Sequence, residues 1–307
     1  MATSPHQPVL YQPVLDLLEP LDGGRYVDGT LGAGGHAHGI LTASGPNGRL
    51  LGLDVDGEAI ALAKERLDKF GDRANIVQAS YTTLDQQLYV IGWDQVDGIL
   101  LDLGASSMQF DSPERGFSFM QSGPLDMRFD NSLGQSAAEL VNNVTEEDLA
   151  ALLREYGEER KARRIARAIT KARPLQTTSE LAELVAKSVG RPQERIHPAT
   201  RTFQALRIAV NTELENVKAV LPQALAALKP GGRMAVISFH SLEDRMVKRF
   251  IQQHSRPPAV NPDLPPSSEH WEPNLKEITR KPVTADEEEV QLNPRSRSAK
   301  LRVAEKV

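Results

Sequence analysis

Four glycines crowd a short loop near the N-terminus of the chain, directly after a run with the composition of a β-strand. They are Gly29, Gly32, Gly34 and Gly35, within the stretch RYVDGTLGAGGHA of residues 25–37. Glycine has no Cβ, so a backbone that contains several glycines can turn tightly and come close to a ligand. The exposed backbone amides of such a loop are suited to bind the polar groups of a nucleotide-type cofactor.

A carboxylate follows this loop at the distance that a ribose-binding residue requires. Residues 49–56 (RLLGLDVD) are typical of a buried strand, and Asp54 stands near its end, about 20 residues beyond the glycines. An aspartate at this place can accept hydrogen bonds from both hydroxyls of a ribose. The alternative is a tight strand-to-helix turn with an unrelated surface aspartate behind it. The spacing favours a cofactor site.

The composition limits the classes of chemistry. The chain has 307 residues and 40% hydrophobic content, enough for one large domain or two. It contains no cysteine, which excludes disulfides, thiolate zinc sites and a cysteine nucleophile and fits a reducing compartment, so we expect a cytoplasmic protein. The seven histidines are scattered without a His-Glu-x-x-His run, and we expect no bound metal. No secretion signal and no apolar run of about 18 residues are present, so we expect no membrane span.

Strands and helices alternate through the first hundred residues. After the strand that ends at Asp54, residues 56–70 carry a helical apolar stripe, and residues 75–79 and 96–104 are predicted to be further strands. The last of these, VDGILLDLG, is almost continuously apolar and leads to Asp102, as expected for a strand buried on both faces. The alternation predicts an α/β fold with a parallel sheet.

The alternation then stops for about one hundred residues, which is too long for a structureless connection in a compact domain. We therefore predict an inserted, mainly helical domain over residues 109–208. Residues 1–108 and 209–307 form the other domain, which is discontinuous in sequence.

The insert carries a dense positive charge. The net charge of the protein is −5, yet residues 154–173 hold eight Arg or Lys against three Glu. Helices are predicted to begin after Thr145 and Thr177, each followed three residues later by an acidic residue that completes a capping motif. The basic face either binds an anionic partner or is a solvated surface paired with its own glutamates. Arg163 and Arg167 are one helical turn apart and neither balances the charge of the other, which favours an anionic partner.

The end of the chain is predicted to return to the sheet. Residues 197–228 are expected to form one long helix with a kink at Pro222, followed by a strand over residues 234–239. Ser241 is expected to cap the next helix. Two antiparallel edge strands complete a set of seven, over residues 275–279 and 298–306.

Two cofactors compete for the glycine loop. Gly32-x-Gly34-x-x-Ala37 satisfies the dinucleotide fingerprint, so an NAD(P)-dependent oxidoreductase is an alternative. A dehydrogenase would need a second mononucleotide-binding half, whereas this chain ends in an antiparallel hairpin. A five-strand unit closed in this way resembles the class I methyltransferase fold, a Rossmann-like fold with a seven-stranded, mostly parallel sheet. That fold binds S-adenosylmethionine at the same strand ends.

Further phrases resemble one family across nearly the whole chain, the RsmH family, also called MraW. They are DGTLGAGGHA, LLDLGASS, ERGFSFM, GPLDMR, GEER, HPATRTFQALRI and ISFHSLEDR. The resemblance implies an S-adenosylmethionine-dependent enzyme that methylates the exocyclic N4 amine of a cytidine in the decoding region of bacterial 16S rRNA. Its partner would then be the small ribosomal subunit. A noncatalytic RNA-binding module on the same fold is a third alternative, and the oligomeric state, a homodimer included, stays open.

The resemblance also implies the cofactor contacts. Asp54 would hold the ribose, Tyr81, where the family often has phenylalanine, would lie along the adenine, and Asp102 would address the methionine end. Alternatively, Tyr81 is a plain core residue, and His36 is an exposed helix-start residue that offers only its backbone amide. The full set of implied contacts is Gly34, Gly35, His36, Asp54, Tyr81, Asp102 and Gln109.

The chemistry requires alignment more than activation. Methyl transfer from a sulfonium is an in-line displacement with an activated leaving group. Without cysteine, the covalent route to carbon 5 of cytosine is closed, and an amine or hydroxyl target remains open. A cytosine amine is a poor nucleophile, and Asp102 is the candidate acceptor of its hydrogen bond. The chain departs here from the Asn- or Asp-Pro-Pro-aromatic motif of many amino-methyltransferases, because Leu103 and Gly104 follow.

A base within structured RNA must be splayed from its stack while Arg and Lys hold the flanking phosphates. His240 is a candidate for substrate binding, because the strand before it ends beside the active cleft in this fold. His240 and Ser241 are adjacent and cannot easily face each other as base and nucleophile, which argues against a hydrolase. The candidate RNA-binding residues are Arg160, Lys161, Arg163, Arg164, Arg167, Arg201 and His240.

Overall fold

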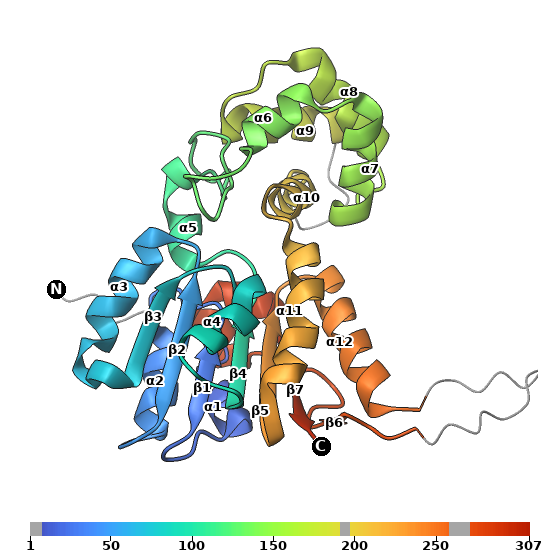
Figure 1. Ribbon diagram of the computed structural model, residues 1–307. Coiled ribbons are helices and arrows are strands. Elements are labelled where there is room, and N and C mark those ends of the chain that lie inside the picture. The colour runs from blue at the N-terminus through green and yellow to red at the C-terminus, as the bar shows by residue number, and fades with distance from the viewer. Residues whose placement is uncertain (1–7, 191–196, 258–270) are drawn as a thin grey trace, which may run out of the picture. The chain divides into compact units, whose positions relative to one another are not determined.

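The computed structural model describes residues 8–190, 197–257 and 271–307. The chain divides into two compact units (Figure 1). Unit 1 consists of residues 1–104 and 215–307, and unit 2 of residues 105–214. The insert proposed from the sequence, residues 109–208, falls inside unit 2. Among the described residues, no helix is both long and apolar enough to cross a membrane.

Unit 1 contains the predicted seven-stranded sheet. Its strands are β1 (Arg25–Asp28), β2 (Arg49–Asp54), β3 (Ala74–Gln78), β4 (Val96–Asp102), β5 (Leu228–Ser238), β6 (Leu275–Glu277) and β7 (Lys300–Lys306). They lie in the order β3-β2-β1-β4-β5-β7-β6. The first five strands in this order, β3, β2, β1, β4 and β5, pair in parallel. The strand β7 is antiparallel to both of its neighbours, β5 and β6.

The sheet order separates the two folds that the glycine loop left open. A fold built from two dinucleotide-binding halves has strands in the order 3-2-1-4-5-6. Here the antiparallel β7 lies between β5 and β6. The predicted class I methyltransferase fold is therefore confirmed.

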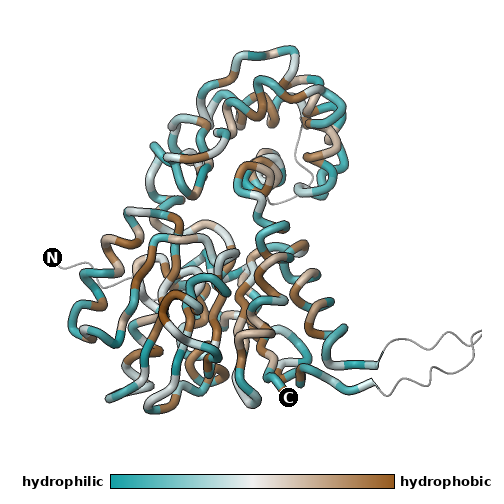
Figure 2. Tube along the Cα trace, viewed as in Figure 1, coloured by the Kyte–Doolittle hydropathy of each residue, from teal (hydrophilic) through white to brown (hydrophobic). Residues whose placement is uncertain are grey.

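Helices cover both faces of the sheet, because successive strand residues point to opposite sides. Leu100 packs in one core with the helices α1 (Tyr11–Leu18), α2 (Gly35–Ala43) and α3 (Gly57–Leu67). Leu101 packs in the other core with α4 (Leu84–Val90), α11 (Glu213–Ala227) and α12 (Ser241–Ser255). Figure 2 shows the hydrophobic residues concentrated along the strands and the inner helix faces. The remaining short elements of this unit are η1 (Asp68–Arg73), η2 (Tyr81–Thr83), α13 (Glu287–Leu292) and η4 (Pro294–Ser298).

The register places three carboxylates at one edge of the sheet. Asp28, the last residue of the central strand β1, lies opposite Gly52 of β2 and Leu100 of β4. The two neighbouring strands each continue for two more residues and end in Asp54 and Asp102. Because the strands are parallel, their carboxyl ends meet at this edge, where ligands bind in open α/β sheets.

Unit 2 is built from helices around its own core. Its elements are α5 (Ser107–Asp111), η3 (Pro113–Arg115), α6 (Ala137–Asn143), α7 (Glu146–Gly157), α8 (Ala162–Ala172), α9 (Thr178–Val189) and α10 (Thr200–Asn211). The predicted caps are confirmed, since the side chain of Thr145 accepts a hydrogen bond from the Asp148 amide and Thr177 forms a capping box with Glu180. Two further capping boxes, of Ser136 at the start of α6 and of Ser106 at the start of α5, were not predicted.

The predicted single helix over residues 197–228 is wrong. It is two helices, α10 and α11, separated by Thr212, whose φ of 49° is left-handed. The side chain of Asn211 donates to the carbonyl of Met127 and accepts from the amide of Phe129, at 2.7 and 2.8 Å. These bonds fasten the end of α10 to a loop more than 80 residues earlier in the chain, a contact that local helix patterns do not reveal. Pro222 lies inside α11.

Candidate functional site

The glycine loop connects β1 to α2 and is fastened to the strands on either side. The amide of Gly29 donates to the carbonyl of Leu100 in β4, and the amide of Leu31 donates to Leu53 in β2, at 2.9 and 2.8 Å. A Cβ at Gly29 would lie 2.7 Å from a methyl carbon of Leu101, so any side chain there would force Leu101 to shift. Gly34, at the N-cap of α2, has a φ of 74°. The loop is thus fixed tightly across the end of β1.

Asp54 is held in place by two backbone amides. Its Oδ2 accepts from Gly32 at 2.7 Å and its Oδ1 from Asp56 at 2.9 Å. Burial raises the pKa of Asp54, and these two hydrogen bonds oppose the rise. Each carboxylate oxygen has two lone pairs, so both oxygens can still accept a hydroxyl. The carboxylate is therefore positioned next to the glycine loop and is able to bind a diol.

Thr30 connects the other two carboxylates of this edge. Its backbone amide donates to Oδ1 of Asp28 at 3.2 Å, and its hydroxyl oxygen accepts from the amide of Asp102 at 2.6 Å. Asp28 is 1% exposed, whereas a quarter of the Asp102 side chain is accessible. A ligand can therefore touch Asp102 and not Asp28. Asp28 was not among the predicted site residues, although it directly precedes the glycine loop.

His36 completes this group from the second residue of α2. Its Nε2 lies 3.7 Å from Oδ2 of Asp102, and the side chain is buried, so the alternative of an exposed His36 is wrong. Burial lowers the pKa of His36 to about 4. The imidazole is therefore neutral at pH 7, and its approach to Asp102 is not an ion pair.

Several polar atoms of this group have no hydrogen-bond partner. Among the described residues, these are Oδ2 of Asp28, Oδ1 of Asp102 and both ring nitrogens of His36. Buried polar groups are normally hydrogen-bonded, and an unsatisfied one typically costs about 1–3 kcal/mol. Unpaired atoms beside a glycine loop fit a site that is completed by a polar ligand.

Tyr81 and Gln109 lie in different units. Tyr81 starts η2, just after β3, and packs half-buried against the core of unit 1. Gln109 belongs to α5 of unit 2, where it is buried and forms a capping box with Ser106. Gln109 therefore has a structural role within its own unit, and its contact with a cofactor stays a prediction.

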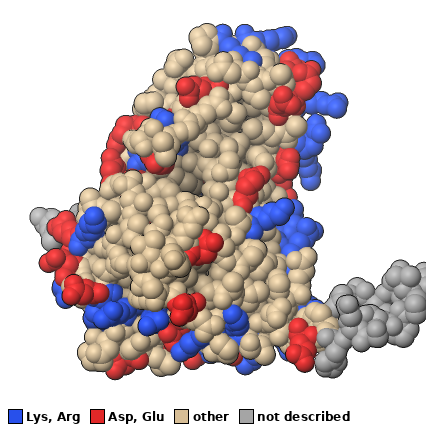
Figure 3. Space-filling model, in the orientation of Figure 1, with Lys and Arg blue, Asp and Glu red and all other residues tan. Residues whose placement is uncertain are grey.

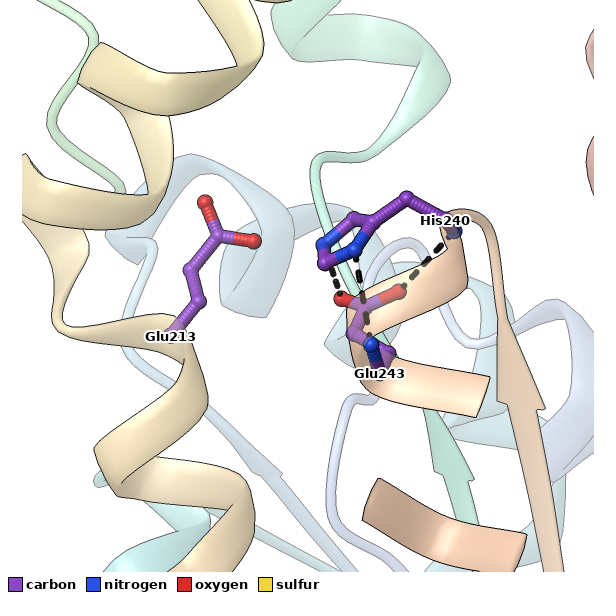
Figure 4. A group of neighbouring side chains, drawn as sticks. All are labelled: Glu213, His240 and Glu243. Atoms are coloured by element: carbon purple, nitrogen blue, oxygen red, sulfur yellow. Dashed lines mark hydrogen bonds and ion pairs between the residues drawn. The ribbon is translucent and has the colours of Figure 1, made fainter. Parts of the chain in front are cut away.

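His240 follows β5 at the same edge of the sheet, because Ile237 of β5 pairs with Asp102. It is the N-cap of α12: its Nδ1 accepts from the amide of Glu243 at 3.4 Å, and the Glu243 carboxylate accepts from the amide of His240 (Figure 4). The same carboxylate also accepts from the amide of Phe239. The prediction that Ser241 is the cap is wrong. Histidine is not a usual cap, so the His-x-x-Glu spacing was overlooked.

Burial affects the protonation of the carboxylates at this edge. It raises the pKa of Asp28 to about 7, and it raises the pKa of Asp102 well above the usual range. The negative charges of Asp28 and of the fully buried Glu243 raise the pKa of Asp102 further. In the described residues, no Lys or Arg forms an ion pair with Asp28 or Asp102.

The basic residues of unit 2 surround a pocket of about 560 Å³, which we call the basic pocket. Figure 3 shows blue side chains along the margin of α7 and α8, at the upper right. In the described part of the chain, no ion pair involves any of its four arginines, and Lys161 donates from Nζ to the carbonyl of Val189 at 2.9 Å. The pocket is lined by Arg154, Arg160, Lys161, Ala162, Arg163 and Arg164.

The helix α8 explains why these cations face outward. Ala162, Ile165, Ala166 and Ile169 form its buried stripe, which leaves Arg163 and Arg164 exposed. The alternative, pairing with local glutamates, does not hold for Glu159, which is buried and accepts from the amide of Lys161 at 2.7 Å.

Two of the candidate RNA-binding arginines are not part of the pocket. Arg167, which the sequence analysis took as uncompensated, forms an ion pair with Glu146 at 3.3 Å, 21 residues away along the chain. Arg201 lies in the first turn of α10 and is half-buried.

Comparisons with known proteins agree on one family. The model of the MraW methylase family matches residues 3–307. A protein of Geobacter sp. (strain M21) is 53% identical over 98% of each chain, and one of Nitrosococcus oceani is 51% identical over 99% of this chain and 97% of the other. A protein of Geobacter sulfurreducens is 49% identical over 99% of this chain and all of its own. All three are called ribosomal RNA small subunit methyltransferase H.

Proposed function

The chain belongs to the MraW methylase family and is an S-adenosylmethionine-dependent methyltransferase, and we propose that it methylates the N4 amine of a cytidine in the decoding region of 16S rRNA. Its partner in this proposal is the small ribosomal subunit, and its location is the cytoplasm. The observation that carries the proposal is the arrangement at the edge of the sheet, where the glycine loop, Asp54 and the partly unsatisfied group around Asp102 meet.

The residues at this edge fit the cofactor from end to end. Asp54 accepts hydrogen bonds from the ribose hydroxyls, and Tyr81 lies along the adenine. The loop at Gly34 and Gly35 faces the methionine end, together with His36 and Asp102. Gln109 is a further proposed contact of the cofactor. The unsatisfied atoms of Asp102 and His36 support this arrangement, because a polar ligand would supply the missing partners.

When bound, S-adenosylmethionine supplies a methyl carbon that is already activated by a sulfonium. The protein then has to bring the target amine into line with that carbon and exclude other nucleophiles. Asp102 accepts a hydrogen bond from the amine, and this bond directs the nitrogen lone pair toward the methyl carbon. The negative carboxylate also stabilises the positive charge that develops on the nitrogen as the new bond forms. His240, at the adjacent strand end, contacts the target nucleotide.

The basic pocket binds phosphates of the RNA backbone. Arg160, Lys161, Arg163 and Arg164 line it, and their cationic groups neutralise phosphates while the target cytidine is splayed from its stack. The two further candidates, Arg167 and Arg201, belong to the same proposal with weaker support, because Arg167 already pairs with Glu146.

The test is methyl incorporation into defined RNA substrates. The protein is incubated with tritiated S-adenosylmethionine and with free 16S rRNA, a partly assembled subunit or the finished small subunit, each from cells that lack the chain. The RNA is digested and its nucleosides are separated. N4-methylcytidine from one decoding-region position supports the proposal. Label at another atom or position would contradict the target, and no label in any substrate would favour a noncatalytic RNA-binding module.

A further inference from the structure

We propose that Asp28 and Asp102 retain one proton between the two of them while the cofactor site is free, and that the pair releases this proton to solvent when the cationic methionine end of the cofactor binds at Asp102. This inference rests on the proposed cofactor site. It assigns a role to Asp28, which does not reach the ligand itself.

The two aspartates end neighbouring strands and are linked through Thr30. The amide of Thr30 donates to the Asp28 carboxylate and its hydroxyl oxygen accepts from the backbone amide of Asp102, so one residue positions the Asp28 side chain and the backbone that carries the Asp102 side chain. Oδ2 of Asp28 and Oδ1 of Asp102 are buried without a hydrogen-bond partner among the described residues. No Lys or Arg in that part of the chain neutralises either of them. A buried pair of this kind needs a proton or another cation.

The surrounding groups add negative charge. Asp54 acts on Asp28, and Glu243 acts on Asp102. His36 is the nearest ring to Asp102, but its lowered pKa keeps it neutral at pH 7, so it supplies no counter-charge. His240 lies at the same edge, where its Nδ1 accepts from the amide of Glu243 and its Nε2 lies 3.2 Å from Oε1 of Glu243. Since burial also raises the pKa of both aspartates, the pair titrates as one coupled unit that retains a proton near neutral pH.

Cofactor binding changes the balance of charge. The α-ammonium group of the methionine end brings a positive charge to the accessible side of Asp102, and this favours the ionised form of the pair. The carboxyl O–H bond breaks, its electrons stay on the oxygen, and the proton passes to a buffer base. Asp102 is then an ionised acceptor, as the proposed reaction requires. The pair therefore makes Asp102 competent only when the cofactor is present.

Calorimetric titration with S-adenosylhomocysteine measures this release directly, because that ligand retains the ammonium group. Titrations at pH 7 in phosphate and in Tris differ in heat by the number of protons released times the difference in buffer ionisation enthalpy. We expect release of up to about one proton per ligand, and an affinity that rises with pH from 6 to 8 by up to about tenfold per unit. Equal heats in both buffers, with normal binding, would overturn the inference and leave the proposed function intact. Absence of binding would overturn both.

Three matched variants identify the source of the proton. Asp28→Asn retains the size of the side chain but cannot share a proton, so we expect the buffer-dependent heat to fall by at least half and the pH dependence of the affinity to flatten. Asp56→Asn and His240→Asn each keep a good helix cap, and we expect both to release the proton as the wild type does. Undiminished release in Asp28→Asn, or its loss in His240→Asn, would assign the proton elsewhere. The wild-type titration decides the main point even if one variant folds poorly.

Discussion

The hydroxyl oxygen of Thr30 lies 2.6 Å from the backbone nitrogen of Asp102 and accepts its hydrogen bond. Thr30 belongs to the glycine loop after β1, and Asp102 ends β4, so the bond joins two elements that are 72 residues apart in sequence. The loop thereby sets the position of the carboxylate that the proposed reaction uses. In the proposed site, cofactor binding and catalytic geometry would therefore be linked through the side chain of Thr30.

Replacing Thr30 tests this link. Thr30→Val keeps the shape of the side chain but leaves the Asp102 amide without its acceptor, and we expect a loss of about 1–3 kcal/mol in the free energy of unfolding. S-adenosylhomocysteine should also bind several-fold more weakly, because the end of β4 shifts. Thr30→Ser retains the hydroxyl and should stay close to the wild type in both measurements. A valine variant that unfolds and binds like the wild type would show that the bond is unimportant.

Substitutions of Asp102 separate its charge from its hydrogen bonding. We expect Asp102→Ala to bind S-adenosylmethionine weakly and to lose methyl transfer, by about 100-fold or more in kcat. Asp102→Asn has no negative charge to balance the developing cation, so its kcat should fall. Because it can still accept a hydrogen bond, the fall should be smaller than that of Asp102→Ala. Single-turnover transfer of tritiated methyl groups to the small subunit measures both. Near-normal turnover in the two variants would remove Asp102 from the mechanism.

The burial of Asp28 predicts a dependence of stability on pH. A folded-state pKa of about 7, above the usual 3.8, means that the folded protein binds more protons than the unfolded chain between these values. Stability is therefore lost as the pH rises through this window, by at most about 4 kcal/mol from this group. Asp28→Asn removes the free-energy cost of keeping an ionisable carboxyl group buried as the pH rises. Its Tm relative to the ligand-free wild type should thus increase between about pH 5 and pH 8, as followed by circular dichroism. A constant difference in Tm would mean that Asp28 is ionised throughout.

The basic pocket predicts a specific salt dependence of RNA binding. Each phosphate contact that is removed should reduce the slope of log affinity against log salt concentration by about 1. We expect Arg163→Ala with Arg164→Ala to reduce the slope by about 2 for 16S rRNA fragments, as measured by filter binding. The matched control is Arg167→Ala, which removes a cation from the same helix that is already paired with Glu146. Equal effects of the double variant and the control would indicate general electrostatics and no dedicated pocket.

Much of the fold follows from local patterns in the sequence. Strand composition and alternation predict the seven strands, because apolar runs such as Val96–Asp102 are read from neighbouring residues. The caps at Thr145 and Thr177 are equally local. Asp54 and Asp102 could be singled out because each ends an apolar strand, and parallel pairing then brings them to one edge.

The features that were missed depend on contacts between distant residues. The break at Thr212 accompanies the bonds of Asn211 to the loop at residues 127–129, and Arg167 pairs with a glutamate 21 residues away. The role of Asp28 depends on a burial that only the packed sheet creates. His240 was overlooked as a cap for a different reason, since its signal was local but its residue type is rare at that position.

The central claim is that the cofactor lies across the carboxyl ends of β1, β2 and β4. A crystal structure of the protein with S-adenosylhomocysteine tests it most directly. We predict that both ribose hydroxyls lie within hydrogen-bond distance of the Asp54 carboxylate and that the ammonium group lies beside Asp102. Ligand density elsewhere, with this edge of the sheet vacant, would contradict the account.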